Sequence, residues 1–284
     1  MGIKEIKEIK KVLIVVPVRL NSSRLPNKVI ADIGGKPMLT RVLEQCKKAL
    51  KKNNIILCTD SDVLVDIAKN LGIKSLVTKK NCKSGSERIS SVYKDLLRIA
   101  WSTDFLGDEQ NHNNFEEKKK QTLIINVQGD QPFLDPKVIQ EMIDVCFKKE
   151  QIPDVITPIY KLNKSEIHNP AVVKTLLNQN MQAIYFSRSA LPYIRDERKE
   201  DWHLHYNYWG HVGIYGFRGD IISKWNQFPN SKLEKLENLE QLRLVDAGVK
   251  IDTFKVNGKF LSIDTKEQLE IARKIVSQDS GNTN

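Results

Sequence analysis

The chain has 284 residues, and its 45 Lys and Arg against 35 Asp and Glu give a formal net charge of +10 with histidine neutral. This length allows one large α/β domain or two small ones, and either can bury a core without disulfides. Apolar residues make up 40% of the chain and charged residues 28%, which argues against a disordered or a membrane protein. The apolar run at residues 12–16 is too short for a spanning helix or a signal peptide, so we expect a soluble, cytoplasmic protein.

The cysteines and the basic residues narrow the class of protein further. No Cys-x-x-Cys motif occurs, so we expect buried thiols rather than disulfides or metal ligands at Cys46, Cys58, Cys82 and Cys146. The lysines and arginines are spread along the chain, which indicates solvated helix faces more than a nucleic-acid surface. An anionic small substrate therefore fits the positive charge better than nucleic acid.

The first half of the chain alternates short apolar runs with helical patterns. We expect strands at residues 11–18, 54–59, 75–78 and 122–127, and helices at residues 37–50, 62–71, 85–100 and 136–148. This alternation is typical of a parallel sheet with right-handed crossovers. Residues 1–10 read as a polar leader, and residues 102–121 lack an apolar period, which predicts a mobile surface insertion.

From about residue 152 the pattern changes. We expect strands at residues 154–160, 171–177, 181–186 and 211–218, with no long helix between them. This predicts an antiparallel layer over about residues 152–218, as a subdomain or a dimer contact. A helix at residues 233–247, a strand at 250–256 and a closing helix at 266–276 follow, so we expect one domain over residues 11–275 and a tail at 276–284.

A basic loop follows the first expected strand. Residues 17–28 contain Arg19, Arg24 and Lys28 among small polar residues, and this edge of an open parallel sheet is where ligands bind. Backbone N–H groups and cations there could wrap a polyphosphate, although the loop matches neither the Walker A motif nor G-x-G-x-x-G. The alternative is an ordinary solvated basic loop.

Two aspartates stand at similar positions in distant segments. Asp130 follows the strand at residues 122–127 in a Gly turn, and Asp264 precedes the closing helix. Either carboxylate could be a Mg²⁺ ligand, or Asp130 could stabilise its turn. Asp264 could also be the helix N-cap, or Thr265 could be, with Gln268 completing a capping box. If both aspartates meet at the sheet edge, they form a metal site.

The remaining candidates for chemistry are weaker. His203 and His205 would share one face of an extended segment, so zinc must be considered, but no cysteine or third ligand is nearby. No G-x-S-x-G motif follows a strand, which disfavours a Ser/His/Asp hydrolase. A cluster of four aromatic residues is typical of a core or an interface: Trp202, Tyr206, Tyr208 and Trp209.

Seven segments together resemble the 3-deoxy-manno-octulosonate (Kdo) cytidylyltransferase family, over about residues 11–275. These segments occur in the order and at nearly the spacing of that family: VVPVRLNSSRLPNKVIADIGGKPMLTRVLEQ, SGSERI, NVQGDQPFLDP, YFSRSALPYIRD, HVGIYGFR, LEKLENLEQLR and SIDTKEQLE. The resemblance implies a Rossmann-like α/β nucleotidyltransferase fold, a homodimer, and a requirement for Mg²⁺. It also implies transfer of CMP from CTP to Kdo for lipopolysaccharide synthesis, with release of pyrophosphate.

The same resemblance implies roles for residues at matching positions. Arg19 and Lys28 would bind the phosphates, and together with Asp130 they would carry catalysis. The cytidine would lie against Gln128 and the turn at residues 84–88, with Ser84 and Arg88. The metal would be bound by Asp130 and Asp264. The sugar acid would be held by Arg188 or Arg195 and by His211, Tyr215, Glu240 and Gln241.

The sequence departs from the family pattern at several positions. Gln131 stands where the family usually has Glu, which leaves the task of that carboxylate open, and Gly210 stands where a basic residue commonly precedes the histidine. Because a lost cation would suit a substrate that carries an amine, 8-amino-Kdo or another acidic sugar is an alternative acceptor. A hypothesis from another class is a non-catalytic nucleotide- or nucleic-acid-binding module, which the two aspartates disfavour because phosphate binding alone gains nothing from them.

Overall fold

A computed structural model describes residues 10–22, 25–101, 112–258 and 260–281. Arg24 of the basic loop, most of the expected polar leader and part of the expected tail lie outside these described residues. The strands are β1 (Lys11–Val18), β2 (Ile55–Thr59), β3 (Lys74–Val77), β4 (Thr122–Val127), β5 (Val155–Lys161), β6 (Lys174–Leu177), β7 (Ala183–Ser187), β8 (Trp209–His211), β9 (Ile214–Arg218) and β10 (Ile251–Lys255).

The helices of the described residues follow the same alternation in the first half of the chain. They are α1 (Met38–Ala49), α2 (Asp62–Asn70), α3 (Gly85–Ser91), α4 (Tyr93–Trp101), α5 (His112–Lys120), α6 (Pro136–Lys148), α7 (Lys164–Ile167), α8 (Trp202–His205), α9 (Gly219–Ser223), α10 (Lys232–Glu237), α11 (Leu242–Asp246) and α12 (Lys266–Gly281). Within the described part of the chain, no helix combines the length and the apolar character that crossing a membrane requires.

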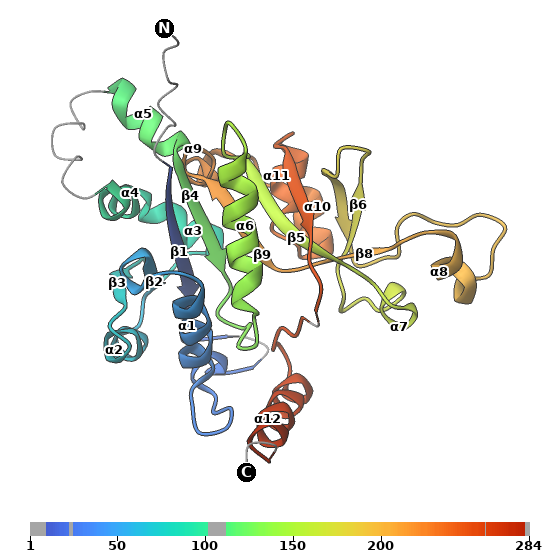
Figure 1. Cartoon of the computed structure of the whole chain (residues 1–284), viewed down its shortest axis with the longest axis horizontal. Coiled ribbons are helices and arrows are strands. Elements are labelled where there is room, and N and C mark those ends of the chain that lie inside the picture. The colour runs from blue at the N-terminus through green and yellow to red at the C-terminus, as the bar shows by residue number, and fades with distance from the viewer. Residues whose placement is uncertain (1–9, 23–24, 102–111, 259, 282–284) are drawn as a thin grey trace, which may run out of the picture.

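All ten strands belong to one mixed sheet in the order β3-β2-β1-β4-β9-β5-β8-β6-β7, with β10 paired to β5 (Figure 1). Strands β3, β2, β1 and β4 are parallel, as the sequence predicts. Strand β9 runs antiparallel to both β4 and β5 and joins this half to the rest. The expected antiparallel strands are therefore present, and they continue the same sheet.

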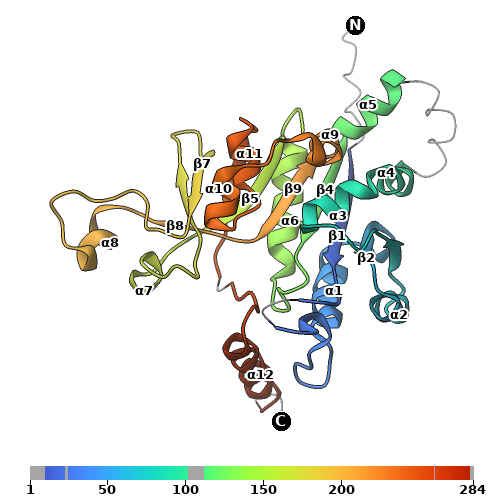
Figure 2. The ribbon, with the colours of Figure 1, turned by 180° about the vertical axis from the view of Figure 1, so that it is seen from behind.

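Alternate residues of the central strands supply two cores, one on each face of the sheet. On β1, Ile14 and Val16 pack on one face, whereas Leu13 and Val15 pack on the other. Helices α1 and α6 cover the first face (Figure 1), and α3, α9 and α11 cover the second (Figure 2). With both faces covered, the loops at the strand ends stay accessible to a ligand.

Several expected elements are interrupted. The helix expected at residues 85–100 breaks at Val92 into α3 and α4. The helix expected at residues 233–247 breaks where Asn238 adopts a left-handed backbone with φ 53° and ends α10. The single strand expected at residues 211–218 is interrupted at Val212 and Gly213, and the two parts, β8 and β9, both pair antiparallel with β5.

Helix α5 forms in part of the expected insertion at residues 102–121, of which residues 102–111 lie outside the described residues. The sequence did not predict this helix, because it has no continuous apolar stripe. It is stabilised instead by a Glu116–Lys119 ion pair at 2.7 Å and by Phe115, which packs against Leu97 and Trp101.

Residues 188–208 form an arm between β7 and β8 that projects from the body and carries α8 (Figure 1). In the arm, the Trp202 ring stacks with Tyr208 and meets Tyr193 edge-on, and Trp202 and Tyr208 belong to the same hydrophobic core as Ile14 and Val16. The expectation that these aromatic residues are core or interface residues is thus confirmed for Trp202 and Tyr208, which are buried. All four cysteines are free and buried, as expected.

Candidate functional site

Two cavities meet at the ends of β1 and β4. The first, here the basic cavity, has a volume of about 250 Å³ and is lined by Arg19, Lys28, Lys83 and Arg88 among others. The second, the amide-lined cavity, has a volume of about 520 Å³ and carries amide side chains that include Gln128, Gln131, Asn169 and Gln241. Gln128, Asp130 and Asp264 line both cavities.

Close packing against the side chain of Val18 explains the glycine in the turn after β4. A Cβ on Gly129 would lie only 2.2 Å from Val18 Cγ1 at the end of β1, so no side chain fits there. Because β1 and β4 are neighbouring parallel strands, this close approach places the loop with Arg19 and Lys28 next to Asp130.

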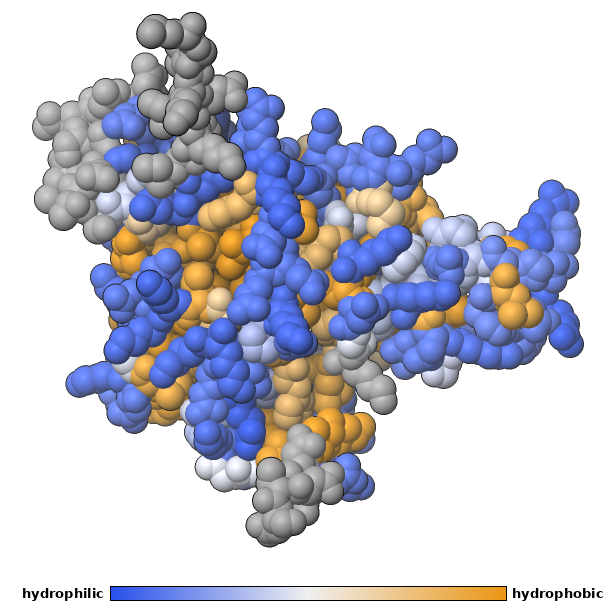
Figure 3. Space-filling view, in the orientation of Figure 1, coloured by the Kyte–Doolittle hydropathy of each residue, from blue (hydrophilic) through white to orange (hydrophobic). Residues whose placement is uncertain are grey.

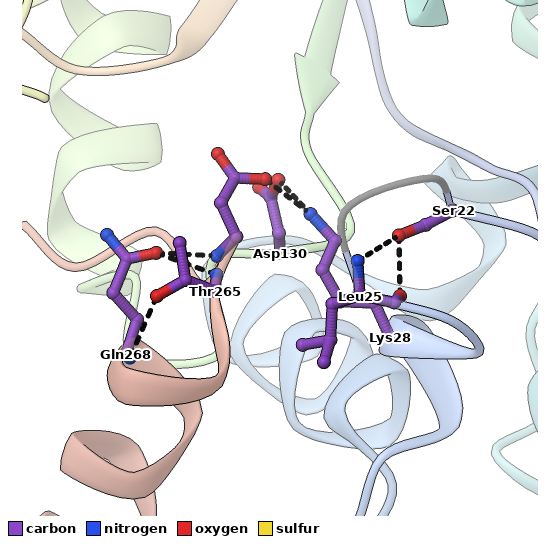
Figure 4. A network of polar contacts seen from close by, with 7 residues as sticks. Ser22, Leu25, Lys28, Asp130, Thr265 and Gln268 are labelled. Carbon is purple, nitrogen blue, oxygen red and sulfur yellow. Dashed lines mark hydrogen bonds and ion pairs between the residues drawn. The ribbon is translucent and has the colours of Figure 1, made fainter.

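The two aspartates converge on one cation. Lys28 Nζ lies 2.9 Å from an oxygen of Asp130 and 2.9 Å from an oxygen of Asp264 (Figure 4). Burial lowers the pKa of Lys28, but the two carboxylates more than offset this, and the pKa of Lys28 is raised from its ordinary value. The expectation that the two acidic segments meet at the sheet edge is confirmed by this geometry.

The start of α12 explains why the Asp264 carboxylate is available. Gln268 Oε1 accepts from the N–H groups of Asp264 and Thr265, and Thr265 Oγ1 accepts from the N–H of Gln268 (Figure 4). Thr265 and Gln268 therefore form the capping box expected as one alternative. Asp264 is not needed as the cap, so its side chain can turn towards Asp130.

The donor set at this point fits a divalent metal ion. Hard cations prefer carboxylate oxygens, and the ammonium of Lys28 marks a position within reach of both carboxylates. Among the described residues, no group of three or more His, Cys, Asp and Glu side chains could hold a metal. A metal at Asp130 and Asp264 would thus need oxygens from a ligand, and Lys28 would have to leave the position it occupies.

The turn at the start of α3 supports the floor of the basic cavity. Ser84 caps the helix by accepting from the N–H of Glu87 at 3.2 Å. Arg88 is buried, donates to Asp60 at 3.0 Å and also contacts Thr78. Ser84 and Arg88 therefore lie where the sequence predicts, but the guanidinium of Arg88 is engaged by protein groups.

A contact that the sequence did not reveal joins this turn to the second cavity. Ser86 Oγ donates to Glu240 Oε1 at 3.0 Å, across 154 positions of the chain. Burial is the largest influence on Glu240 and raises its pKa, while bonds from Ser84 and Ser86 act in the opposite direction.

Lys83, which lines the basic cavity, was also not predicted from the sequence, because this lysine belongs to no motif.

His211, which is half-buried, and Tyr215, which is buried, line the amide-lined cavity as uncharged groups. Burial lowers the pKa of His211 to about 3 and raises that of Tyr215, so both are neutral near pH 7. Thr157 Oγ1 lies 2.8 Å from Ile214 O, 3.2 Å from Val212 O and 3.0 Å from His211 Nε2. When the Thr157 hydroxyl donates to one of the two carbonyls, Nε2 of His211 carries the proton and Nδ1 is an acceptor.

Two further groups in this cavity can bind a ligand. Nε2 of Gln241 is buried without a hydrogen-bond partner among the described residues, so it is a donor that a ligand could satisfy. Arg188 lines the cavity and is fixed by bonds from its Nε to Glu237 O at 2.9 Å and from its Nη1 to Pro170 O at 3.0 Å.

The structure separates the two candidate arginines. Arg195 lies on the projecting arm, with a side chain that is 90% exposed and 3.6 Å from Asp196, and it lines neither cavity.

The geometry expected for a zinc site at His203 and His205 is not found among the described residues. His203 and His205 lie on the short helix α8 rather than on an extended segment, and His205 Nε2 is 3.4 Å from Glu197.

Comparisons with known proteins agree over nearly the whole chain. A family model described as cytidylyltransferase matches residues 13–100 and 108–251. The 3-deoxy-manno-octulosonate cytidylyltransferase of Chloroherpeton thalassium is 33% identical over 94% of this chain and 98% of its own length. The protein of the same name from Escherichia coli is 32% identical over 95% of this chain and 97% of its own length.

Solved structures are similar too. A structure of CMP:2-keto-3-deoxy-manno-octonic acid synthetase complexed with CTP superimposes with a TM-score of 0.77 and 30% identity, covering 95% of this chain and 99% of that chain. A cytidylyltransferase from Leptospira borgpetersenii, with a TM-score of 0.54 and 17% identity, covers 95% of this chain and 87% of that chain and shares the fold.

Proposed function

Because the chain belongs to the cytidylyltransferase family, we propose that it transfers CMP from CTP to the anomeric hydroxyl of an acidic 3-deoxy sugar, Kdo. The products would be pyrophosphate and CMP-Kdo, the latter for lipopolysaccharide synthesis. One observation carries the proposal: the two cavities share Gln128, Asp130 and Asp264, which is where two substrates would have to meet.

The basic cavity would hold the nucleotide. Arg19 and Lys83 line it, and Lys28 would move from the aspartates to the triphosphate, so that three cations offset its charge. A contact between unit charges at 4 Å is worth about 1 kcal/mol in water but about 4 kcal/mol at an effective dielectric of 20, so an enclosed site binds far better. The cytidine would lie against Gln128 and the turn after Ser84, which Arg88 supports from behind.

The amide-lined cavity would hold the sugar acid. Arg188 would bind the carboxylate, and Nδ1 of His211 and the carboxyl group of Glu240 would accept bonds from hydroxyl groups. The unpartnered amide of Gln241 and the hydroxyl of Tyr215 would donate. These groups would fix the anomeric hydroxyl in line with the α-phosphorus, which is the geometry that phosphoryl transfer requires.

We assign the metal requirement to Asp130 and Asp264, and Mg²⁺ is the metal we propose. When bound, it would supply positive charge that lowers the pKa of the attacking hydroxyl and stabilises the phosphate oxygens. Arg19 and Lys28 would take up the negative charge that develops on the leaving pyrophosphate. No covalent bond between the protein and either substrate is needed.

Release of pyrophosphate is the test of this function. We expect release from wild-type protein only when CTP, Mg²⁺ and Kdo are all present, and no comparable release when ATP, GTP or UTP replaces CTP. A protein that binds random DNA in a salt-sensitive manner but forms no pyrophosphate from CTP and any acidic sugar would instead be a non-catalytic binding module.

A second acceptor, 8-amino-Kdo, is favoured by the charges in the sugar site. In the part of the chain that the structure describes, Arg188 is the only cationic residue that lines the amide-lined cavity, against Asp130 and Asp264 and against Glu240, whose ionised form burial disfavours. A Cβ on Gly210 would lie 2.5 Å from Leu162 Cδ2 and 2.6 Å from Tyr160 Cε1, so a basic side chain there would require both neighbours to shift. Comparison of kcat/KM for Kdo and 8-amino-Kdo separates the two acceptors.

We further propose a homodimer in the cytoplasm. Strand β7 is an edge of the sheet and exposes Ile184 by 49%, and Leu236 on α10 is 83% exposed. An apolar patch also lies on the projecting arm near α8 (Figure 3), where Leu204 is 71% exposed. Sedimentation analysis should show a dimer. Leu236→Glu should weaken the dimer if the interface includes α10.

A further inference from the structure

One wall of the amide-lined cavity is a short loop before β6. Asn169 and residues 171–173 line the cavity next to Arg188. The backbone carbonyls of this loop face protein donors. Val173 O accepts from the N–H of His211 at 2.9 Å, and Pro170 O accepts from Arg188 Nη1 at 3.0 Å. The wall is therefore held in place by residues that themselves line the cavity.

Lys174 holds the same loop from behind. It is the first residue of β6 and is 0% exposed, and its Nζ donates to Asn169 O at 2.8 Å and to Val172 O at 2.7 Å. Burial lowers the pKa of Lys174 to about 8, with a smaller contribution from the charge of Arg188. A buried ammonium is costly, so these two carbonyl bonds must stabilise it.

Lys174 and Arg188 bind alternate parts of one loop. Lys174 donates to the carbonyls of Asn169 and Val172, and Arg188 donates to the carbonyl of Pro170, which lies between them in the chain. The loop therefore cannot move outward without breaking at least one of these bonds. Arg188 is in turn held by Glu237, whose carboxylate accepts from its N–H at 3.0 Å. This places two cations side by side at the wall, only one of which lines the cavity.

We propose that Lys174 is a positioning residue for the acidic sugar: it fixes the wall at residues 169–173 so that Arg188 meets the substrate carboxylate. This inference rests on the proposed function for the identity of the sugar. It assigns to Lys174 no contact with substrate and no part in nucleotide binding, because Lys174 lines neither cavity. Its loss should therefore affect one substrate and not the other.

The test is Lys174→Met, which keeps the length of the side chain and removes both bonds to the carbonyls. We expect KM for Kdo to rise by about 10-fold or more, with KM for CTP changed less than about two-fold. Hydrogen exchange of the free protein provides a readout that does not need activity. The amides of Val172 and His211, which bond to Asn169 O and Val173 O, should exchange faster, while amides in β1 should not.

The control is Lys161→Met, which removes an exposed lysine from the end of β5 and should leave both KM values and both amides unchanged. Equal increases in the two KM values, or unchanged exchange at Val172, would overturn the positioning role. Wild-type protein that forms no pyrophosphate from CTP and Kdo would instead overturn the proposed function, and the two failures are thus distinguishable.

If Lys174→Met does not fold, Lys174→Arg serves the same purpose. It keeps the charge and the donors, but its wider head group must shift the carbonyls of Asn169 and Val172. We expect a rise of a few-fold in KM for Kdo and none for CTP. An Arg variant with both KM values at the wild-type level and unchanged exchange at Val172 would contradict the inference.

Discussion

The basic cavity and the amide-lined cavity share an edge but use different physical means to bind a ligand. In the basic cavity, cations on solvent-facing loops do the binding, and Arg19 and Lys83 are exposed there. In the amide-lined cavity, burial disfavours the charged forms of two groups, with the pKa of His211 lowered and that of Glu240 raised. The basic cavity works mainly through charge, whereas the amide-lined cavity adds directed hydrogen bonds to the charge of Arg188.

This difference suggests a division of labour. Charge attracts a polyphosphate over a distance but hardly discriminates among anions. Buried hydrogen-bonding groups discriminate strongly, because a ligand that leaves them unpaired loses the full cost of their desolvation. We therefore expect substitutions in the basic cavity to affect turnover and metal use, and substitutions in the amide-lined cavity to affect recognition of the acceptor.

The largest effect should come from Asp130 and Asp264, which line both cavities and therefore belong to neither alone. Asp130→Asn or Asp264→Asn removes one of the two charges that converge on Lys28, and with it a ligand of the proposed metal. We expect kcat for pyrophosphate release to fall by about 10³-fold or more, since the metal acts in the transition state.

Thermal unfolding and an exposed aspartate provide the controls for this loss. Asp130→Asn should keep a cooperative transition, because the side chain is at the rim and not in either core. Asp66→Asn on the surface of α2 should have wild-type kcat. Wild-type turnover in both Asp130→Asn and Asp264→Asn would exclude their role in binding a metal.

Glu240→Gln should separate recognition from stability within the amide-lined cavity. We expect kcat/KM for Kdo to fall by about 10² because a buried acceptor of hydroxyl bonds becomes partly a donor. The free energy of unfolding of the variant should instead rise. Because burial raises the pKa of Glu240, its carboxyl group is favourable when protonated and becomes costly as the pH rises through the pKa of the folded state.

Urea unfolding of Glu240→Gln at several pH values checks that sign. The variant should be more stable than wild type at pH 8, and the difference should shrink as the pH falls towards about 4.3, where the unfolded glutamate is also protonated. A variant that is less stable than wild type at pH 8 would show that the Ser86 bond outweighs the cost of burial.

Lys28→Met should change metal binding in the basic cavity. In the free protein the ammonium of Lys28 occupies the position between Asp130 and Asp264, so it competes with any metal. We expect the affinity for Mn²⁺ without nucleotide, measured by calorimetry, to rise by about 10-fold in the variant. Lys36→Met, which breaks a surface pair with Glu44, should not change it. If both variants bind Mn²⁺ as wild type does, Lys28 is not a competitor.

The positions of Arg19, Lys28, Asp130 and Asp264 could be predicted from the sequence because each follows or precedes a recognisable element, and parallel strands end at the same edge. Other features depend on distances that a sequence does not contain. The Ser86–Glu240 bond joins two helix starts far apart in the chain, and the choice of Arg188 over Arg195 depends on where the arm leaves the sheet. The breaks at Val92 and Asn238 were missed because apolar spacing continues across both.

The last prediction concerns stability at acid pH and not activity or binding, and it rests on His211. Because burial lowers the pKa of His211 to about 3, the folded protein does not bind the proton that unfolded His211 takes up below about pH 6.5. Stability should therefore be fully present above that pH and fall by up to about 1.4 kcal/mol per pH unit below it. In His211→Gln this part of the slope should be absent, so the free energy of unfolding of wild type should fall relative to that of the variant between pH 7 and pH 5. Parallel curves would mean that His211 takes up a proton in the folded state, and its Nδ1 could then not accept a hydroxyl bond from the sugar.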